Sequence, residues 1–516
     1  MKQDAAQIFA EYEKLSGYNQ QIGLYETVKK NENFFIGKQW EGVNAPNLDK
    51  PVINILKRAV AYFLSVVVSD DVSVSLSGFS EDAPDMPVLD MLSAQFDEVF
   101  ERAKVKEKNR DALKNAAVDG DGCFYMYFDP NAPAGALTPG AICVDVIDNT
   151  NILFANPEEP EVQKQPYLLI LMRKTLEQVR SEAVKNGISN EQMEAIRPDD
   201  AENAGGEVKE DDKVSVILKL WKSEETGTVH AAKCTRDVIL QDEVDLGYRL
   251  YPVAYFSWDK VKNSYHGQAA ITGLIPNQIF INKLFAMCME HVKKMAFPKL
   301  VYNEDLLPDG LTNQVGEALA VRGDPNMAIA VGVGAADMSA QVLHLIERII
   351  AHTRDAMGAT DAALGSVRPD NTSAIIALQR ASAMPLELQR MAFYQFIEDY
   401  VRVFLDMMRV NYGLRRVTLS AEGKSKTALF DFSKLSEFDL KLNIDVGASA
   451  YWSELMQVQT VDNLFARGVI SDAVTYLESV PDGYIKNKRR LIEKIKERET
   501  TGGGEANGGE MSGLRL

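Results

Sequence analysis

The chain has 516 residues, of which 46% are hydrophobic and 25% are charged. This composition is ordinary for a globular protein and excludes a chain that is disordered throughout, while the length suggests about three domains. The 56 basic and 74 acidic residues give a net charge of −18. Proteins that bind nucleic acid through its phosphates usually have a basic domain or a basic band on their surface, and the composition of this chain does not indicate one.

Other features of the sequence argue against three further classes of protein. These are disulfide or zinc-finger proteins, secreted proteins and membrane-spanning proteins. The four cysteines lie far apart without a CxxC pair, which indicates neither a disulfide framework nor a zinc finger and favours a reducing compartment. Asp4 and Glu11 stand where a signal peptide needs an apolar stretch, so we expect no secretion. The longest apolar runs, 59–68 and 327–336, are shorter than the roughly 18 residues that span a membrane, so we expect no membrane helix.

The first half of the chain mixes helical and strand patterns. Helical patterns cover 4–33 and 85–118, and another begins near Pro51, a residue favoured in the first turn of a helix. Strand patterns follow the Asp-Gly-Asp-Gly turn at 119–122, in CFYMYF, AICVDVI, YLLILMR, KVSVILKLWK and PVAYFSW. This order predicts an α+β fold without a series of βαβ units. The polar, acidic stretch 187–213 is expected to be a solvated insertion.

In the second half, two long helical patterns enclose a small strand-rich segment. The patterns cover 264–297 and 339–359, and Pro276 either starts the first helix or kinks it. At about 1.5 Å per residue the second helix would be roughly 30 Å long. The segment between them has about forty residues, too few for an independent domain, so we expect it to dock on another surface.

The stretch LGSVRPDNTSAIIALQRASAMPLE, residues 364–387, interrupts this helical patterning. A helical pattern resumes over 373–412 with Pro385 inside it. Proline lacks an N–H and clashes with the carbonyl four residues earlier, so Pro385 predicts a kink. Strand patterns return at VTLSAEG, KTALFDF and FDLKLNIDV, helical patterns follow, and a glycine-rich tail begins at Thr500.

Motifs of catalysis and metal binding are not found in the sequence. The only GKS triplet, 423–425, has Thr418 where a phosphate-binding loop needs its first glycine. The histidines form no metal-binding pair, and His344 and His352 are two helical turns apart. We therefore expect no catalytic residue, no metal and no cofactor. The basic stretch 485–498 is interpreted as the solvated face of an amphipathic helix, with contact to DNA or an acidic partner as the alternative.

Three segments resemble the portal proteins of tailed bacteriophages. They are FFIGKQW (34–40), SYHGQAAITGLIPNQIFINKLFAM (264–287) and RPDNTSAIIALQRASAMPLELQR (368–390), and they follow the order of that family. The resemblance covers most of the chain. It implies the α+β portal fold, with a mixed α/β wing, long stem helices, a small β-rich clip and a helical crown.

The resemblance also assigns a part of that fold to each segment. The parts are the wing (1–263 and 413–450), the stem helices (264–296 and 339–358), the clip (297–338), the tunnel loop (359–372), the long kinked wing helix (373–412), the crown helices (451–499) and a flexible tail (500–516). A clip too small to fold alone fits a ring, because neighbouring copies can pair with it without leaving open edges.

The function implied by the resemblance is structural. Subunits, typically twelve, would form a ring at one capsid vertex, leaving a channel through which double-stranded DNA is packaged and ejected. The ring would bind the terminase large subunit, a head-tail adaptor, and the major capsid or scaffolding protein, with no membrane involved. It would assemble in the host cytoplasm and become part of the virion. About six to ten firm phosphate contacts already change DNA affinity by about 10³ to 10⁵ over a modest salt range, so a mostly repulsive, acidic wall would let the duplex slide.

Candidate site residues follow from their positions in the family fold. Arg368, Asp370 and Asn371 would face DNA from the tunnel loop, with the ordering of its own turn as the alternative role of Arg368. Possible channel-lining residues are Lys293 and Lys294, which could equally pair with acids of the neighbouring subunit. The clip residues expected to dock partners are Pro308, Asp309, Gly310, Arg322 and Asp324.

Two alternative functions are open. A DNA-acting enzyme of the same packaging system, a nuclease or the motor ATPase, would need a phosphate-binding loop or clustered metal-binding carboxylates, and the sequence shows neither. A scaffold or adaptor could oligomerise by helix packing without a channel. The oligomeric state and an ATPase assay would separate these functions.

Overall fold

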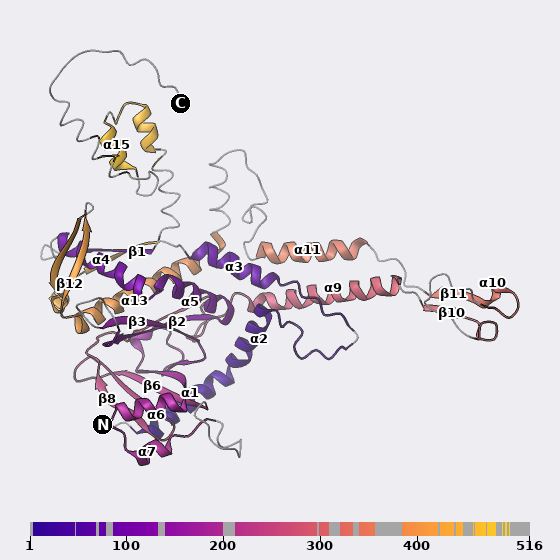
Figure 1. Cartoon of the computed structure of the whole chain (residues 1–516), viewed down its shortest axis with the longest axis horizontal. Helices are drawn as coiled ribbons and strands as arrows, with labels where there is room; N and C mark the ends of the chain where they lie inside the picture. Colours follow the sequence, from indigo (N-terminus) through magenta and orange to yellow (C-terminus); the bar gives the residue numbers. More distant parts are fainter. Residues whose placement is uncertain are drawn as a thin grey trace, which may run out of the picture. The chain divides into compact units, whose positions relative to one another are not determined.

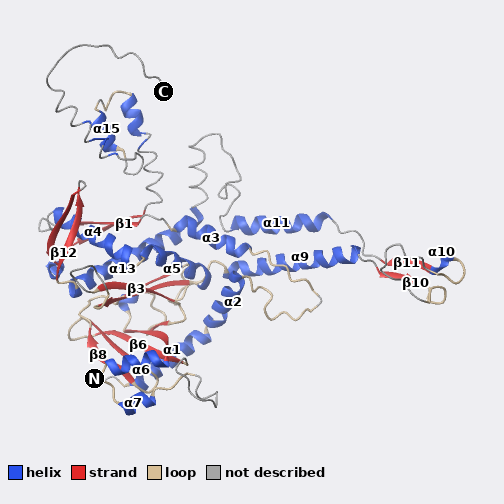
Figure 2. Cartoon of the chain, viewed as in Figure 1, coloured by secondary structure: helices blue, strands red, loops and turns tan. Residues whose placement is uncertain are grey.

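In the structure of the chain, a computed structural model, the residues form two compact units. The larger comprises Met1–Val68 and Ser75–Asn443, and the smaller Ser69–Val74 and Ile444–Leu516. Helices and strands both occur throughout, which confirms the predicted α+β class (Figure 2). The residues that the structure describes are 4–46, 48–68, 72–78, 86–132, 140–199, 212–296, 299–308, 320–333, 340–356, 384–421, 424–437, 440–446, 458, 460–470, 472–480, 488, 491–492 and 495.

Two helices replace the single one predicted over 4–33. They are α1 (Ala5–Gln21) and α2 (Leu24–Ile36), separated at Gly23, whose φ of 71° is a left-handed conformation that glycine adopts without strain. The next helix, α3 (Ile55–Val67), begins later than predicted from Pro51. Its N-cap is Asn54, whose side chain accepts a hydrogen bond from the Lys57 N–H at 3.0 Å.

The helix predicted over 85–118 is also divided in two. It consists of α4 (Met86–Arg102) and α5 (Val105–Asp119), with Lys104 between them at a φ of 52°. A lysine rarely adopts this left-handed conformation, so the sequence carries no signal for the break. The break lets α4 and α5 pack against each other, and α5 also packs on the strand that follows it.

A three-stranded antiparallel sheet forms the centre of the larger unit. Its strand order is β3 (Ala141–Ile147), β2 (Asp121–Asp129) and β9 (Val253–Ser257), with Cys123 opposite Ile147 on one side and Tyr255 on the other. Helix α5 and helix α13 (Glu387–Asn411) lie on the same face of this sheet (Figure 1). These strands confirm three of the strand patterns in the sequence.

A second antiparallel sheet has five strands in sequence order. They are β4 (Ile152–Phe154), β5 (Tyr167–Thr175), β6 (Lys213–Lys222), β7 (Val229–Cys234) and β8 (Ile239–Asp245). Ile217 packs in a core with α1, and its neighbour Val216 packs with α6 (Leu176–Lys185). Since successive residues of a strand face opposite sides, the two helices cover opposite faces of the sheet.

The expected insertion at 187–213 is partly structured. It contains the short helix α7 (Asn190–Ala195), and Ile196 is only 2% exposed because it packs against α6 and the five-stranded sheet. Residues 200–211 lie outside the described residues.

Two long helices bracket a small sheet, as predicted. Helix α9 (Ile275–Ala296) follows the 3₁₀ turn η2 (Thr272–Leu274), and Pro276 lies in its first turn, so the proline starts this helix. The other helix is α11 (Ala340–Ala356), which lies beside α9 (Figure 1). Between them in sequence, β10 (Lys299–Tyr302) pairs antiparallel with β11 (Ile329–Val333), which follows the one-turn helix α10 (Pro325–Ala328).

Helix α13 supplies the aromatic core of the larger unit. Phe393, Phe396, Tyr400 and Phe404 recur every three or four residues along it and are at most 1% exposed. Their rings contact Phe100, Phe124 and Phe256 at centroid distances between 4.9 and 6.2 Å. This packing holds α13 firmly between α4 and the central sheet.

The remaining elements are three 3₁₀ turns, two pairs of strands and one short helix. They are η1 (Val162–Lys164), η3 (Met384–Leu386), η4 (Phe432–Glu437), the hairpin of β12 (Leu414–Ala421) and β13 (Lys424–Asp431), the pair of β1 (Val72–Gly78) and β14 (Leu440–Val446), and α15 (Ala473–Ser479). Among the described helices, none has a stretch long and apolar enough to span a bilayer.

Candidate functional site

Helices α9 and α11 pack along a narrow seam and expose apolar side chains outside it. In the seam, Asn277 Nδ2 donates to Thr353 Oγ1 at 3.3 Å, and Ile346 and Thr353 are each 3% exposed. Outside it, large apolar side chains between 40% and 64% exposed occur along and around both helices, and we call this set of residues the apolar face: Phe280, Met287, Met289, Val292, Met295, Leu343 and Leu345. A soluble monomer rarely exposes so many large apolar side chains on one pair of helices, so these helices are suited to binding protein.

A buried network of amide side chains fixes the start of α9. The Ile55 N–H donates to Gln278 Oε1 at 3.0 Å, and Gln278 Nε2 donates to Asn282 Oδ1 at 2.9 Å. Asn282 Nδ2 then donates to Gln39 Oε1 at 2.6 Å, while Gln39 Nε2 donates to the Phe34 carbonyl at 2.9 Å. The three amides are at most 7% exposed. The structure thus brings together two segments that carried the family resemblance, 34–40 and 264–287.

The carboxyl-terminal half of α13 is held by charged hydrogen bonds. Asp406 Oδ2 accepts from the backbone N–H groups of Arg249 and Leu250, at 2.6 and 3.0 Å. Arg409 donates to Asp406 Oδ1 at 2.8 Å and to the Gly247 carbonyl at 2.9 Å. Hydrogen bonds to a carboxylate are stronger than neutral ones, so they fix α13 to the turn before β9.

Pro385 lies in η3, immediately before α13, and is exposed. Residues 373–383, the earlier part of the predicted helix, lie outside the described residues, so the kink at Pro385 stays a prediction. Arg368, Asp370 and Asn371 of the predicted tunnel loop also lie outside them.

Lys293 and Lys294 lie in the last turn of α9 and form ion pairs within the chain. Lys293 pairs with Asp49, and Lys294 pairs with Glu290 at 2.8 Å. Both lysine side chains are more than half exposed. Exposed pairs of this kind contribute about 0 to 1 kcal/mol and exchange readily, so both lysines stay candidates for the channel lining.

The predicted clip residues lie on the surface where they are described. Pro308, Arg322 and Asp324 are exposed, while Asp309 and Gly310 lie outside the described residues. The Arg322 N–H donates to the Leu306 carbonyl at 2.9 Å, and Asp324 Oδ1 accepts from the Asn326 N–H at 3.0 Å. These bonds fix the backbone and leave the side chain of Arg322 directed to the surface.

Sequence patterns did not reveal a buried polar cluster at His266. His266 Nδ1 lies 3.0 Å from Asp121 Oδ2, and its Nε2 lies 3.3 Å from Asn19 Oδ1. The Gly267 N–H donates to the other Asp121 oxygen at 2.8 Å, and Asn149 Nδ2 donates to Asp121 at 3.2 Å. These polar side chains are at most 4% exposed. The cluster therefore joins α1, β2 and the segment before α9, and a substrate in solvent cannot reach it.

Near this cluster, burial raises the pKa of Asp119 to about 7, with further increases from the charges of Glu32, Asp148 and Asp121 that outweigh the opposite effect of Lys114. Asp119 ends α5, and its Oδ1 is buried without a hydrogen-bond partner among the residues that the structure describes. Within the described residues, no group of three or more His, Cys, Asp and Glu side chains is arranged to hold a metal ion.

Comparison with known families identifies the chain. A family model described as Phage P22-like portal protein matches residues 169–426, which is half of the chain. The match includes α9, β10, β11, α11, α13 and β12, and two of the three resembling segments; the segment 34–40 lies outside it. No curated protein matches the chain. The chain belongs to the P22-like family of phage portal proteins.

Proposed function

We propose that copies of this chain form a ring at one vertex of a phage capsid, around a channel through which double-stranded DNA is packaged and ejected. Family membership supports the portal role. The structural observation that supports a ring is the apolar face of α9 and α11. In this proposal the stem helices are 264–296 and 339–358, and the clip is 297–338.

The apolar face supports contact between copies because burying it would be favourable. Each large apolar side chain moved from water into a packed interface contributes about 1.5 to 3 kcal/mol before losses of entropy. The sheet of β10 and β11 adds a second argument. Among the described residues its two strands pair only with each other, and two strands alone are marginally stable in water. Neighbouring copies in a closed ring can cover both the helices and the edges.

The role requires the chain to hold and guide DNA, with no catalytic step. A net charge of −18 makes the subunit repel the duplex on average, which favours sliding over tight binding. In this proposal Arg368, Asp370 and Asn371 lie on the tunnel loop that touches DNA. Lys293 and Lys294 of the stem are our candidates for positive charges that line the channel.

The proposed partners are the terminase large subunit and a head-tail adaptor at the clip, with the major capsid or scaffolding protein around the wing. The exposed Pro308, Arg322 and Asp324 are our candidates for the clip contacts. Such a ring would assemble in the host cytoplasm and remain in the virion.

The oligomeric state tests the ring directly. We expect the purified chain to give rings in negative-stain images and a mass of many subunits, and a monomer under every assembly condition would refute the proposal. The double variant Met287→Gln with Val292→Gln should weaken assembly by removing apolar contacts. Its matched control is Lys283→Gln with Glu290→Gln, which changes exposed polar positions of the same helix and should leave assembly intact. Robust ATP turnover by the isolated chain would instead support the enzyme alternative.

A further inference from the structure

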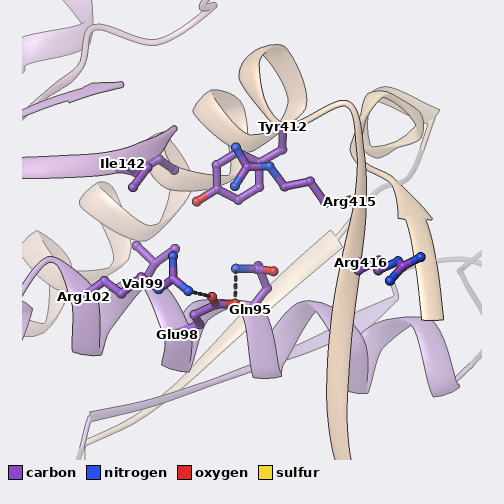
Figure 3. A pocket seen from close by; sticks show the side chains of 9 residues that line it. Gln95, Glu98, Val99, Arg102, Ile142, Tyr412, Arg415 and Arg416 are labelled. Atoms are coloured by element: carbon purple, nitrogen blue, oxygen red, sulfur yellow. Dashed lines mark hydrogen bonds and ion pairs between the residues drawn. The ribbon is translucent and has the colours of Figure 1, made fainter. Parts of the chain in front are cut away.

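A recess of about 40 Å³ lies where α4, β3, the end of α13 and β12 meet, and the chain itself uses the arginines around it (Figure 3). Arg102 pairs with Glu98 at 2.5 Å. Arg415 lies 3.8 Å from the centre of the Tyr412 ring and donates to a backbone carbonyl at 2.9 Å. Arg416, the next residue of β12, points away from the recess (Figure 3). These arginines therefore fix the packing of the surrounding elements, and atoms that are available to a ligand lie elsewhere, at the end of α5.

The carboxyl end of α5 is capped by two asparagine side chains. The last carbonyl groups of a helix have no partner within it, so they accept hydrogen bonds from other groups. Asn31 Nδ2 donates to the Val118 carbonyl at 2.8 Å, and Asn149 Nδ2 donates to the Asp119 carbonyl at 2.9 Å. Each amide nitrogen also donates to a second oxygen, at 2.8 and 3.2 Å respectively. These bonds fix the orientation of both amides, with the nitrogen toward the helix end.

Three buried oxygen atoms around this helix end accept no hydrogen bond from the described part of the chain. They are Asn31 Oδ1, Asn149 Oδ1 and Asp119 Oδ1. Both asparagines are only 1% exposed. Buried polar atoms in native proteins nearly always have a partner, which can be a water molecule or an ion. These three oxygens are therefore suited to a ligand that donates a hydrogen bond or carries positive charge.

The surroundings of Asp119 favour a positive charge. Burial is the main cause that raises the pKa of its carboxyl, and the charges of Glu32, Asp148 and Asp121 raise it further, while Lys114 has the opposite effect. The dipole of α5 adds partial negative charge at the same end of the helix. Four carboxyl groups thus act around this helix end against one lysine, which favours a cation over a neutral water molecule.

The group extends from the surface into the interior. Asp148 is exposed, Glu32 and Asp119 are partly exposed, and the two asparagines are buried. Oxygen atoms are the ligands that Ca²⁺ and Mg²⁺ prefer. Since no three acidic, His or Cys side chains of the described ranges are arranged to hold a metal ion together, amide oxygens and water must complete the ligand set. Ca²⁺ accepts such mixed and irregular sets, whereas Mg²⁺ requires a nearly ideal octahedron.

We propose that the carboxyl end of α5 binds one Ca²⁺ ion through Asp119 and the amide oxygens of Asn31 and Asn149. The ion joins α2, the end of α5 and the turn before β4, which are far apart in sequence. Because Asn31 also donates to Thr272 in the 3₁₀ turn before α9, the ion stabilises the start of α9 as well. Sites with few charged ligands bind Ca²⁺ with dissociation constants of about 10⁻⁴ to 10⁻³ M, and we expect a value in this range.

Calcium binding is tested on the full chain after EDTA has removed divalent cations and has itself been dialysed away. Equilibrium dialysis with radioactive calcium at pH 8 gives the dissociation constant and the number of ions bound. We expect one ion per chain in the stated range. In a parallel experiment at constant ionic strength, about 10 mM CaCl₂ should raise the thermal unfolding midpoint by about 2 °C or more, and MgCl₂ should raise it less.

Substitutions place the ion on the chain. Asp119→Asn keeps the shape of the side chain and should weaken calcium binding by at least about tenfold. Glu32→Gln, at a partly exposed position, should weaken it by about threefold without affecting folding. The control is Asp111→Asn, an exposed carboxylate on the same helix, which should bind calcium like the wild type.

Three results would overturn the proposal. One is the absence of bound calcium in the wild type. Another is unchanged affinity in both Asp119→Asn and Glu32→Gln, which would locate the ion elsewhere on the acidic surface. If Asp119→Asn fails to fold, Glu32→Gln alone decides this point. The third is an equal rise of the midpoint with Ca²⁺ and Mg²⁺, which would indicate a general effect of divalent ions on the acidic chain. None of these measurements depends on assembly, because all the proposed ligands belong to one copy.

Discussion

Replacing Asp119 with asparagine should change how the stability of the larger unit depends on pH. Burial is the main cause that raises the pKa of this carboxyl from 3.8 to about 7. The unfolded chain therefore loses the Asp119 proton near pH 4, while the folded chain keeps it until about pH 7. Because the folded state binds more protons in this range, stability is fully present below pH 4 and is lost as the pH rises toward 7.

The size of the effect follows from that difference. Each pH unit between the two pKa values costs about 1.4 kcal/mol of stability, so raising the pH from 5 to 8 should cost roughly 2 to 3 kcal/mol. Asp119→Asn cannot ionise and should lose this dependence. The substitution can also have a cost in stability that is the same at every pH. This cost cancels when the difference in free energy of unfolding between the variant and the wild type at pH 5 is compared with that at pH 8.

The free energy of unfolding would be measured by urea titration at pH 5, 6, 7 and 8, with tryptophan fluorescence as the readout. Trp258 is a suitable reporter because it is 5% exposed and packs against Phe63 in the larger unit. The control is Asp111→Asn, an exposed carboxylate on the same helix, which should give a profile parallel to the wild type. Parallel profiles for Asp119→Asn and the wild type would refute the reasoning, since the carboxyl would then titrate alike in both states.

Two further substitutions test the packing around the start of α9. Asn282→Ala removes the partner of Gln39 in a buried network and should cost about 1 to 3 kcal/mol in urea unfolding, whereas alanine at the exposed neighbour Lys283 should cost little. Gly120→Ala should cost about 2 kcal/mol or more, because Gly120 has a φ of 110° and an added Cβ would lie 2.6 Å from the Gly267 carbonyl oxygen. Losses below 0.5 kcal/mol, within the usual range of surface changes, would contradict either prediction.

Local patterns in the sequence were sufficient to predict α9, α11 and most strands. In each case apolar periodicity, a proline or a turn motif acts within a few residues, so the signal is contained in the segment itself. The start of α3 shows the limit of this reasoning. Pro51 predicts a first turn at that residue, but the capping side chain of Asn54 sets the start, and both signals are present within four residues.

The features that escaped prediction depend on residues far apart in sequence. His266 meets Asp121 across 145 positions and Asn19 across 247, so no motif spacing contains the cluster. The break at Lys104 has the same origin, because a lysine with positive φ is stabilised by the packing of α4 and α5 on their surroundings and not by its own preference. The recess around Arg415 likewise needs α4, β3 and β12 to be brought together first.

The distribution of burial along α9 leads to a last prediction, on hydrogen exchange. Buried residues of this helix end at Ala286, and the described side chains from Met287 to Ala296 are partly or largely exposed. These ten residues have little tertiary packing, and a segment of this length is too short to be a stable helix in water on its own, where about 12 to 15 residues are needed even for strong helix formers. Amide protons after Ala286 should therefore exchange quickly in a monomeric chain and slowly in the assembled ring, while those of Gln278 and Asn282 stay protected in both. Mass spectrometry of peptides from the two halves of α9 would measure this. Equal protection of both halves in the monomer would show that α9 needs no neighbouring copy, and would remove the main physical support for the ring.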